Sequence, residues 1–111
     1  MGYRGTIETD IRVKPECEEQ LKELINQSRF NTKDEIDTTI AYGDINDGKL
    51  VFKDAWQKWY YIDKFLYRYR HCFENGCCSV SWDDNTTEEW EIKNGKVYII
   101  NDNERVEYKG D

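Results

Sequence analysis

One apolar series in the middle of the chain constrains the fold more than any other feature. Its members are separated by three and four residues in turn, and they are Phe52, Ala55, Trp59, Ile62, Leu66, Tyr69 and Phe73. A helix gathers residues at this spacing onto one face. Asp54 is a suitable N-cap, and Asn75-Gly76 tolerates the backbone of a helix end. The pattern predicts one long amphipathic helix between Asp54 and Asn75.

The first third of the chain predicts a strand followed by a helix. Residues 3–13 alternate, so that one side carries Ile7, Thr9, Ile11 and Val13, which is the period of a half-buried strand. Pro15 suits the first position of a helix, because its missing N–H has no partner there. Apolar residues then recur at helical spacing, which predicts an amphipathic helix over residues 15–26 and a polar connection over 27–34.

Strands are predicted on both sides of the long helix. The β-branched residues of 36–45 favour a strand, and Asn46-Asp47-Gly48 suits the turn of a hairpin that returns through Leu50-Val51-Phe52. Behind the helix, apolar residues alternate with polar ones at Cys78, Val80, Trp82, Trp90 and Ile92. The sequence therefore predicts a second antiparallel segment in the last third of the chain.

Turn signals set the register of that C-terminal segment. Asn94-Gly95 predicts a two-residue turn. Such a turn places Ile92 beside Val97 and Trp90 beside Ile99 on one face. A second turn at 101–103 allows a last strand that contains Val106 and Tyr108. The segment is expected to form a β-meander.

Taken in order, the first six elements match the βαββαβ order of a ferredoxin-like sandwich. We therefore expect an α+β fold, with two helices packed on one sheet and a C-terminal antiparallel β-meander, in a single domain that comprises residues 1–111. The alternative is an antiparallel sheet wrapped around the long helix, with a different strand order. Sequence alone does not order the strands.

Composition and missing motifs exclude several function classes. The 16 Lys and Arg against 23 Asp and Glu give a net charge of −7. No apolar run approaches the roughly 18 residues of a membrane span, and the start MGYRGTIETD lacks an apolar leader. We expect a cytoplasmic protein with no membrane association. The sequence also lacks the phosphate-binding loops, the dinucleotide fingerprint and the hydrolase motifs that would indicate common enzyme chemistries.

A cluster of thiols and the lone histidine offer one alternative function, a small metal-binding protein or thiol enzyme. His71, Cys72, Cys77 and Cys78 lie within eight residues, and thiolates with imidazole suit zinc. Adjacent Cys77 and Cys78 point to opposite faces of a strand, however, which opposes a shared site. We expect Cys17, Cys72 and Cys78 to be small buried residues, and we expect no bound metal or cofactor.

Charge is distributed unevenly, and this offers a second alternative, a ferredoxin-like nucleic-acid-binding domain. Residues 53–82 carry a net charge of +2, whereas 1–52 carry −4 and 83–111 carry −5. Basic residues of the long helix alternate with rings that could stack on bases: Lys58, Lys64, Arg68 and Arg70 with Tyr60, Tyr61, Tyr67 and Tyr69. The net charge opposes a polyanion at long range, so direct binding of nucleic acid is not our expectation.

We interpret the chain instead as a non-enzymatic protein-binding module. Its surplus tyrosines are of the kind that dominates interfaces, and its carboxylates suit a basic partner. The expected partner-binding residues are Tyr60, Tyr61, Tyr67, Arg68, Asp83, Asp84, Glu88 and Glu89. No catalytic residue is expected, and a homodimer is compatible with the sequence.

In small size, acidity and lack of a catalytic set, the chain resembles phage or mobile-element inhibitors of bacterial defence, including anti-CRISPR proteins. This resemblance is one of protein type, with no shared motif. It implies that the protein inhibits a nucleic-acid-handling or defence complex in the host cytoplasm by presenting carboxylates where that complex expects phosphates.

Overall fold

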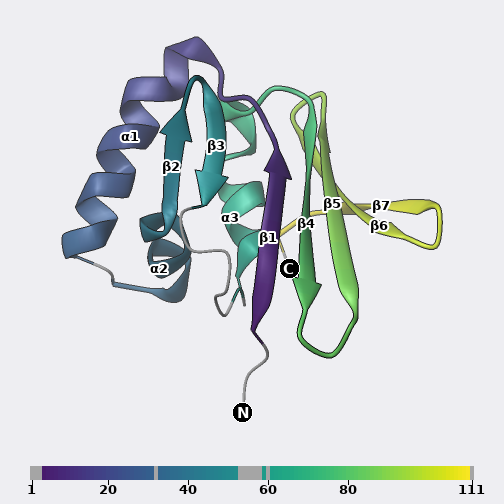
Figure 1. Cartoon of the computed structure of the whole chain (residues 1–111). Helices are drawn as coiled ribbons and strands as arrows, with labels where there is room; N and C mark the ends of the chain where they lie inside the picture. Colours follow the sequence, from purple (N-terminus) through teal and green to yellow (C-terminus); the bar gives the residue numbers. More distant parts are fainter. Residues whose placement is uncertain (1–3, 32, 53–58, 60, 111) are drawn as a thin grey trace.

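The computed structural model describes residues 4–31, 33–52, 59 and 61–110. Three helices and seven strands follow one another along this part of the chain (Figure 1). In order they are β1 (Gly5–Asp10), α1 (Pro15–Phe30), α2 (Glu35–Ala41), β2 (Gly43–Asn46), β3 (Lys49–Phe52), α3 (Ile62–Arg68), the 3-10 turn η1 (Arg70–Cys72), β4 (Gly76–Trp82), β5 (Thr87–Lys93), β6 (Lys96–Asn101) and β7 (Glu104–Tyr108).

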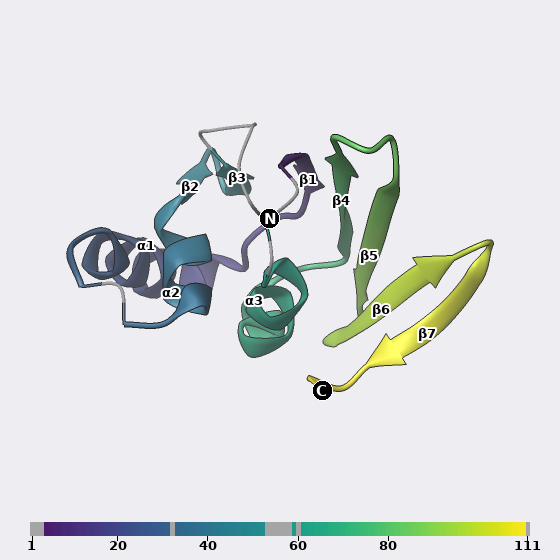
Figure 2. The same cartoon turned by 90° about the horizontal axis from the view of Figure 1, so that it is seen from below.

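The strands form two antiparallel sheets, so the predicted α+β class is confirmed. The larger sheet has the order β1-β4-β5-β6-β7, and β2 and β3 form a separate hairpin. Seen from below, the larger sheet curves around α3, and α1 and α2 lie beside the hairpin (Figure 2). The alternative that the sequence left open, an antiparallel sheet wrapped around the long helix, is matched only in the curvature of the sheet, because the helix that it surrounds is the short α3.

The ferredoxin-like strand order is not confirmed. That fold would place the first four strands in one sheet, whereas β2 and β3 pair only with each other. The hairpin meets the chain that follows β1 through an isolated antiparallel bridge between Arg12 and Lys49. Two backbone hydrogen bonds accompany it, from Leu50 N to Ile11 O and from Val13 N to Gly48 O. β1 itself pairs along its whole length with β4.

The register of the meander agrees with the prediction. Ile92 pairs with Val97, and Trp90 pairs with Ile99. Asn94 and Gly95 connect these strands with φ values of 54° and 76°, the left-handed backbone that a type I′ turn requires. The order of β4 to β7 therefore follows directly from turn chemistry and alternation.

The predicted strand over 36–45 is wrong for its first part, which forms α2 instead. Asp34 is the N-cap of this helix, and its Oδ1 accepts a hydrogen bond of 2.8 Å from the N–H of Asp37. Thr38 and Thr39 each donate a side-chain hydrogen bond to a backbone carbonyl four residues earlier. The cap and the burial of Ile40 outweigh the strand preference of the β-branched residues.

The prediction of a single long helix between Asp54 and Asn75 is also wrong. Phe52 ends β3, α3 spans only Ile62–Arg68, and Phe73 is extended and bridges Val13. The predicted N-cap Asp54 lies outside the described residues. The helical part ends at Cys72 because the chain there pairs with the segment between β1 and α1. Lys14 N donates to Cys72 O, and Glu74 N donates to Arg12 O.

The residues of the apolar series that the structure describes, which exclude Ala55, nevertheless share one core. Ring contacts run from Trp59 to Phe52 at 5.1 Å, from Phe52 to Phe65 at 6.0 Å and from Phe65 to Phe73 at 6.1 Å. The indole N–H of Trp59, which is 2% exposed, donates a 2.8 Å hydrogen bond to Gly5 O in β1. Tertiary packing of a strand end, a helix and an extended segment gathers these rings, and no single helical face is needed.

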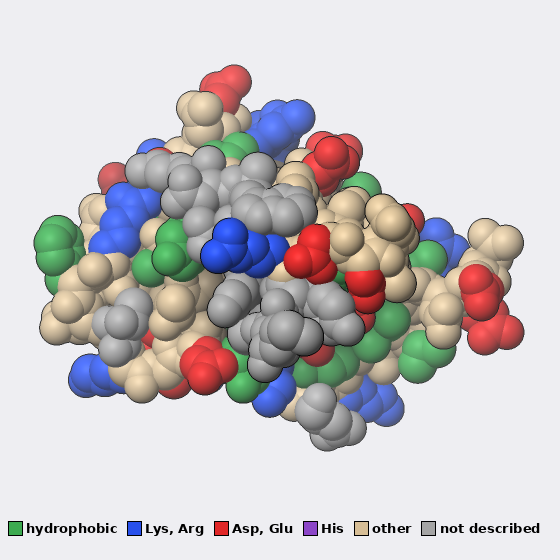
Figure 3. Space-filling model, turned by 60° about the horizontal axis from the view of Figure 1, so that its bottom comes forward, with side chains coloured by type: hydrophobic (Ala, Val, Ile, Leu, Met, Phe, Trp, Pro, Cys, Tyr) green, Lys and Arg blue, Asp and Glu red, His purple; other side chains and the backbone are tan. Residues whose placement is uncertain are grey.

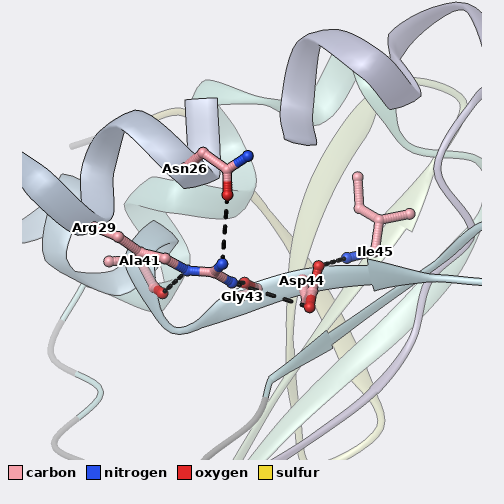
Figure 4. A network of polar contacts seen from close by, with 6 residues as sticks. All are labelled: Asn26, Arg29, Ala41, Gly43, Asp44 and Ile45. Atoms are coloured by element: carbon pink, nitrogen blue, oxygen red, sulfur yellow. Dashed lines mark hydrogen bonds and ion pairs between the residues drawn. The ribbon is translucent and has the colours of Figure 1, made fainter. Parts of the chain in front are cut away.

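Arg29 explains why α1 continues to Phe30, beyond the predicted end at residue 26 (Figure 4). Its guanidinium donates to Ala41 O at 3.2 Å and to Gly43 O at 2.9 Å, which are the carbonyls where α2 ends and β2 begins. A further contact of 4.0 Å joins it to the Asp44 carboxylate. The last turn of α1 is thereby tied to both following elements.

Candidate functional site

A cleft lined by described residues lies between the start of α3 and the β4–β5 pair. It has a volume of about 460 Å³, which is in the range of ligand-binding pockets. Its lining combines three indole rings with three carboxylates, and the lining residues are Trp59, Ile62, Asp63, Trp82, Asp84, Thr86, Glu88 and Trp90. Figure 3 shows the molecule with its lower side turned forward, and several carboxylates (red) are exposed on this face.

Strand alternation builds the sheet side of the cleft. Val80 pairs with Glu88, and Cys78 pairs with Trp90, so Glu88 and Trp90 both face the concave side of the sheet. The indole Nε1–H of Trp82 donates a 2.9 Å hydrogen bond to Oε2 of Glu88. This bond fixes the carboxylate against the partly exposed indole at the rim of the cleft.

Each of the three carboxylates is oriented by hydrogen bonding at one of its two oxygens. Oδ1 of Asp63 accepts from the N–H of Lys64 at 2.8 Å, and Oδ1 of Asp84 accepts from the N–H of Thr86 at 3.0 Å. The hydroxyl of Thr86 also donates to Asp84, and these hydrogen bonds lower the pKa of the Asp84 carboxyl. Asp84 is therefore held in its ionised form to lower pH than an ordinary aspartate.

The second oxygen of each carboxylate accepts no hydrogen bond from the described residues. Among the described residues, no Lys or Arg side chain lines the cleft, and none forms an ion pair with Asp63, Asp84 or Glu88. The described lining is thus anionic and aromatic. Such a site favours a cation over an anion or a neutral ligand.

The predicted partner-binding residues do not form one surface. Asp84 and Glu88 line the cleft, whereas Glu89 faces the opposite side of the sheet because it is adjacent to Glu88 in β5. Asp83 is exposed, and its backbone N–H donates to Arg4 O at 2.9 Å. Tyr60 lies outside the described residues.

The predicted residues of the helix mainly make contacts within the molecule. Tyr67 packs edge-on against Tyr108 at 5.7 Å, and the guanidinium of Arg70 lies 4.0 Å from its ring centre. Arg68 lies 3.9 Å from carboxylate oxygens of both Asp34 and Asp37, which links α3 to the start of α2.

Tyr61 lines a different, more open hollow beside α2. That hollow also contains Glu35 and Lys64. A hydrogen bond with the Glu35 carboxylate raises the pKa of Tyr61, and the Lys64 ammonium lies 5.3 Å from the centre of its ring. Tyr61 is half-buried. It is in contact with Glu35 of α2 and Lys64 of α3.

The thiol and histidine cluster is not brought together. Cys72 and Cys78 are buried, as expected, together with Cys17, whereas Cys77 and His71 are exposed. Burial raises the pKa of Cys78 to about 12. The pKa of Cys72 is also raised to about 12, mainly by burial and to a smaller extent by a hydrogen bond with Cys17. Within residues 4–31, 33–52, 59 and 61–110, no three His, Cys, Asp or Glu side chains are placed to share a metal ion.

Comparisons with known proteins give no relative. No protein-family model, curated protein or solved structure matches the chain significantly. Of the helices in the described part of the chain, none has the length and apolar character needed to cross a membrane.

Sequence reasoning missed most of the cleft lining. Trp59, Ile62 and Trp90 were expected only as core residues, and Asp63 was not singled out. One signal was present in β5. Glu88, Trp90 and Ile92 are two residues apart in turn, so strand alternation already places the Glu88 carboxylate on the same face as the apolar side chains. The approach of α3 to this strand pair had no sequence signal.

Proposed function

We propose that this chain is a non-enzymatic protein-binding module that uses the acidic end of β4 and β5 to occupy a basic surface of its partner. A partner that normally binds nucleic acid fits this charge, so the module would act as an inhibitor of a nucleic-acid-handling or defence complex. The proposal includes action in the cytoplasm, where such complexes operate.

The observation that carries this proposal is the exposure of four carboxylates at one end of the β4–β5 hairpin, two in the turn and two on opposite faces of β5. Asp83, Asp84, Glu88 and Glu89 are all exposed, and none of them has an ion-pair partner among the described residues. Asp84 and Glu88 are already held by hydrogen bonds from Thr86 and Trp82, so they lose little side-chain freedom on binding. Their field would also steer the module toward a positive groove.

The distribution of basic residues supports a protein partner over a nucleic acid. Arg68 is engaged by Asp34 and Asp37, and Arg70 lies on Tyr67 and donates a 2.7 Å hydrogen bond to Tyr67 O. These contacts leave the described basic residues of α3 and η1 less available for phosphates, whose capture needs several free cations.

The test is retention of bacterial proteins on the immobilised module, followed by elution with duplex DNA. We expect retained nucleic-acid-binding proteins to be released by the DNA competitor, because both would occupy the same basic surface. A variant with Asp83, Asp84, Glu88 and Glu89 changed to Lys should lose at least about tenfold in affinity for them.

The matched control applies the same change of charge elsewhere, at the exposed residues Glu16, Glu19, Glu23 and Glu74. This variant should retain the partner within about threefold, the loss expected from net charge alone. An equal loss of affinity in both variants would mean that only the net charge of the module matters and that the end of β4 and β5 is not the binding surface. Retention that DNA does not compete would overturn the phosphate-mimicking role.

A further inference from the structure

The cleft itself, with its indole walls, points to a more specific ligand. Building on the proposed function, we propose that the cleft between α3 and the β4–β5 pair binds the alkylammonium group of a lysine side chain presented by the partner protein. The carboxylates outside the cleft would supply general attraction, and the cleft would recognise one side chain.

The aromatic lining suits the apolar stem and the charge of lysine together. Trp82, which is partly exposed, offers its ring to a ligand, and Trp59 and Trp90, which are 2% and 5% exposed, back the cleft wall behind it. Indole is the aromatic ring that attracts a cation most strongly, and removal from water strengthens this attraction. The methylene chain of lysine also gains from burial against the rings, while its charged end remains near carboxylates.

The three carboxylates favour an ammonium over a guanidinium. They come from different elements: Asp63 from α3, Asp84 from the β4–β5 turn and Glu88 from β5. An ammonium is a compact charge with three N–H donors that diverge, so it can face acceptors on several walls. A guanidinium is planar and pairs best with both oxygens of a single carboxylate, which is a poorer match because each carboxylate here already has one oxygen engaged.

The probe is a blocked Gly-Lys-Gly tripeptide, titrated into the intact chain while amide and indole N–H signals are followed by NMR. We expect saturable shifts of the Trp82 indole with a Kd of about 1–10 mM, the affinity that one side chain can supply. A tripeptide with norleucine in place of lysine keeps the methylene chain without the charge, and it should bind at least about tenfold more weakly.

Conservative variants locate the binding. Asp63→Asn and Glu88→Gln keep an oxygen that can accept the existing hydrogen bonds but remove the charge, and each should weaken the lysine tripeptide by about threefold or more. Glu19→Gln removes the same charge at an exposed position of α1 and should change the Kd by less than about twofold. Unchanged unfolding curves establish that the variants remain folded.

The inference would be overturned if cleft signals did not shift up to about 50 mM lysine tripeptide, a concentration well above the expected Kd. It would also be overturned by equal binding of the norleucine tripeptide, or by tighter binding of a third blocked tripeptide that carries arginine in place of lysine. If any of these occurs while the charge-reversed variant still loses its retained proteins, the lysine site fails and the proposed function stands. If the lysine tripeptide binds but no basic partner is retained, the proposed function fails instead.

Discussion

Trp82 and Glu88 are joined across β4 and β5 by a hydrogen bond of 2.9 Å from the indole Nε1–H to the carboxylate Oε2. The bond connects the aromatic and acidic parts of the cleft. Because both side chains are exposed to water at least in part, we expect the bond to contribute less than hydrogen bonds to charged groups usually do.

A double-mutant cycle measures this contribution. We expect Trp82→Phe and Glu88→Ala to show a coupling of about 0.5–1 kcal/mol in the free energy of unfolding, determined by urea denaturation of the two single variants and the double variant. The same cycle with Glu89→Ala is the control, because Glu89 lies on the other face of the sheet. Equal coupling in both cycles would mean that the hydrogen bond makes no specific contribution.

Arg29 is predicted to be important for stability although it is exposed. Arg29→Ala should lower the free energy of unfolding by about 1–3 kcal/mol, because the carbonyls of Ala41 and Gly43 lose a charged donor. Arg29→Lys should recover only part of this, since an ammonium cannot reproduce the fork of donors. Lys22→Ala, which breaks an exposed pair with Glu18, should cost less than about 0.5 kcal/mol. A loss of that small size for Arg29→Ala would contradict the structural role.

Gly76 is predicted to tolerate no side chain, because β1 crosses close to it. A Cβ at this position would lie 3.0 Å from Cα of Ile11 and still closer to Asp10 O. Gly76→Ala should therefore lower the free energy of unfolding by at least about 2 kcal/mol, the range of backbone-displacing substitutions. Ser81→Ala, at an exposed position of the same strand, should change it by less than about 0.5 kcal/mol. Equal stability of the two variants would show that β1 can move aside.

Cys78 is predicted to make the fold sensitive to alkaline pH. Burial holds its thiol protonated in the folded chain up to a pKa of about 12, whereas an unfolded thiol ionises near 9. The unfolded state therefore binds fewer protons between these values, and stability falls as pH rises. The slope for this thiol is about 1.4 kcal/mol per pH unit.

The measurement compares wild type with Cys78→Ala by urea unfolding at several values between pH 8 and pH 11, approximately the lower part of this window. The variant starts from lower stability because a buried sulfur is lost, but its stability should fall less steeply with pH. Parallel curves would contradict the prediction. Val80→Ala serves as the control, because it removes buried apolar volume from the same strand without removing a titratable group.

The parts of the fold that local chemistry determines could be predicted from the sequence. The turns at Asp47-Gly48 and Asn94-Gly95 require left-handed backbone that these residues adopt readily. Alternation then fixed which side chains of β1, β4 and β5 are buried, with Cys77 exposed and Cys78 buried as expected. Period and turn type need no knowledge of distant residues.

The remaining elements depend on contacts between distant segments. The spacing from Phe52 to Phe73 is helical, yet it is divided among a strand, a helix and an extended segment because residues 12–14 pair with residues 72–74. Likewise, Asp34 caps α2 where β-branched residues favoured a strand. The cleft required both kinds of information, since Glu88 is placed by alternation and Asp63 by the approach of α3.

The pairing of β1 with β4 has a consequence for how the chain folds. The neighbours β4 to β7 are joined by short turns, whereas β1 pairs with a strand that lies beyond all three helices. Closing such a long loop has a large entropic cost and slows folding. We therefore expect the hairpins of the C-terminal third to form early and the first strand to dock last, which leaves the edge of β4 exposed to neighbouring chains during synthesis until it does.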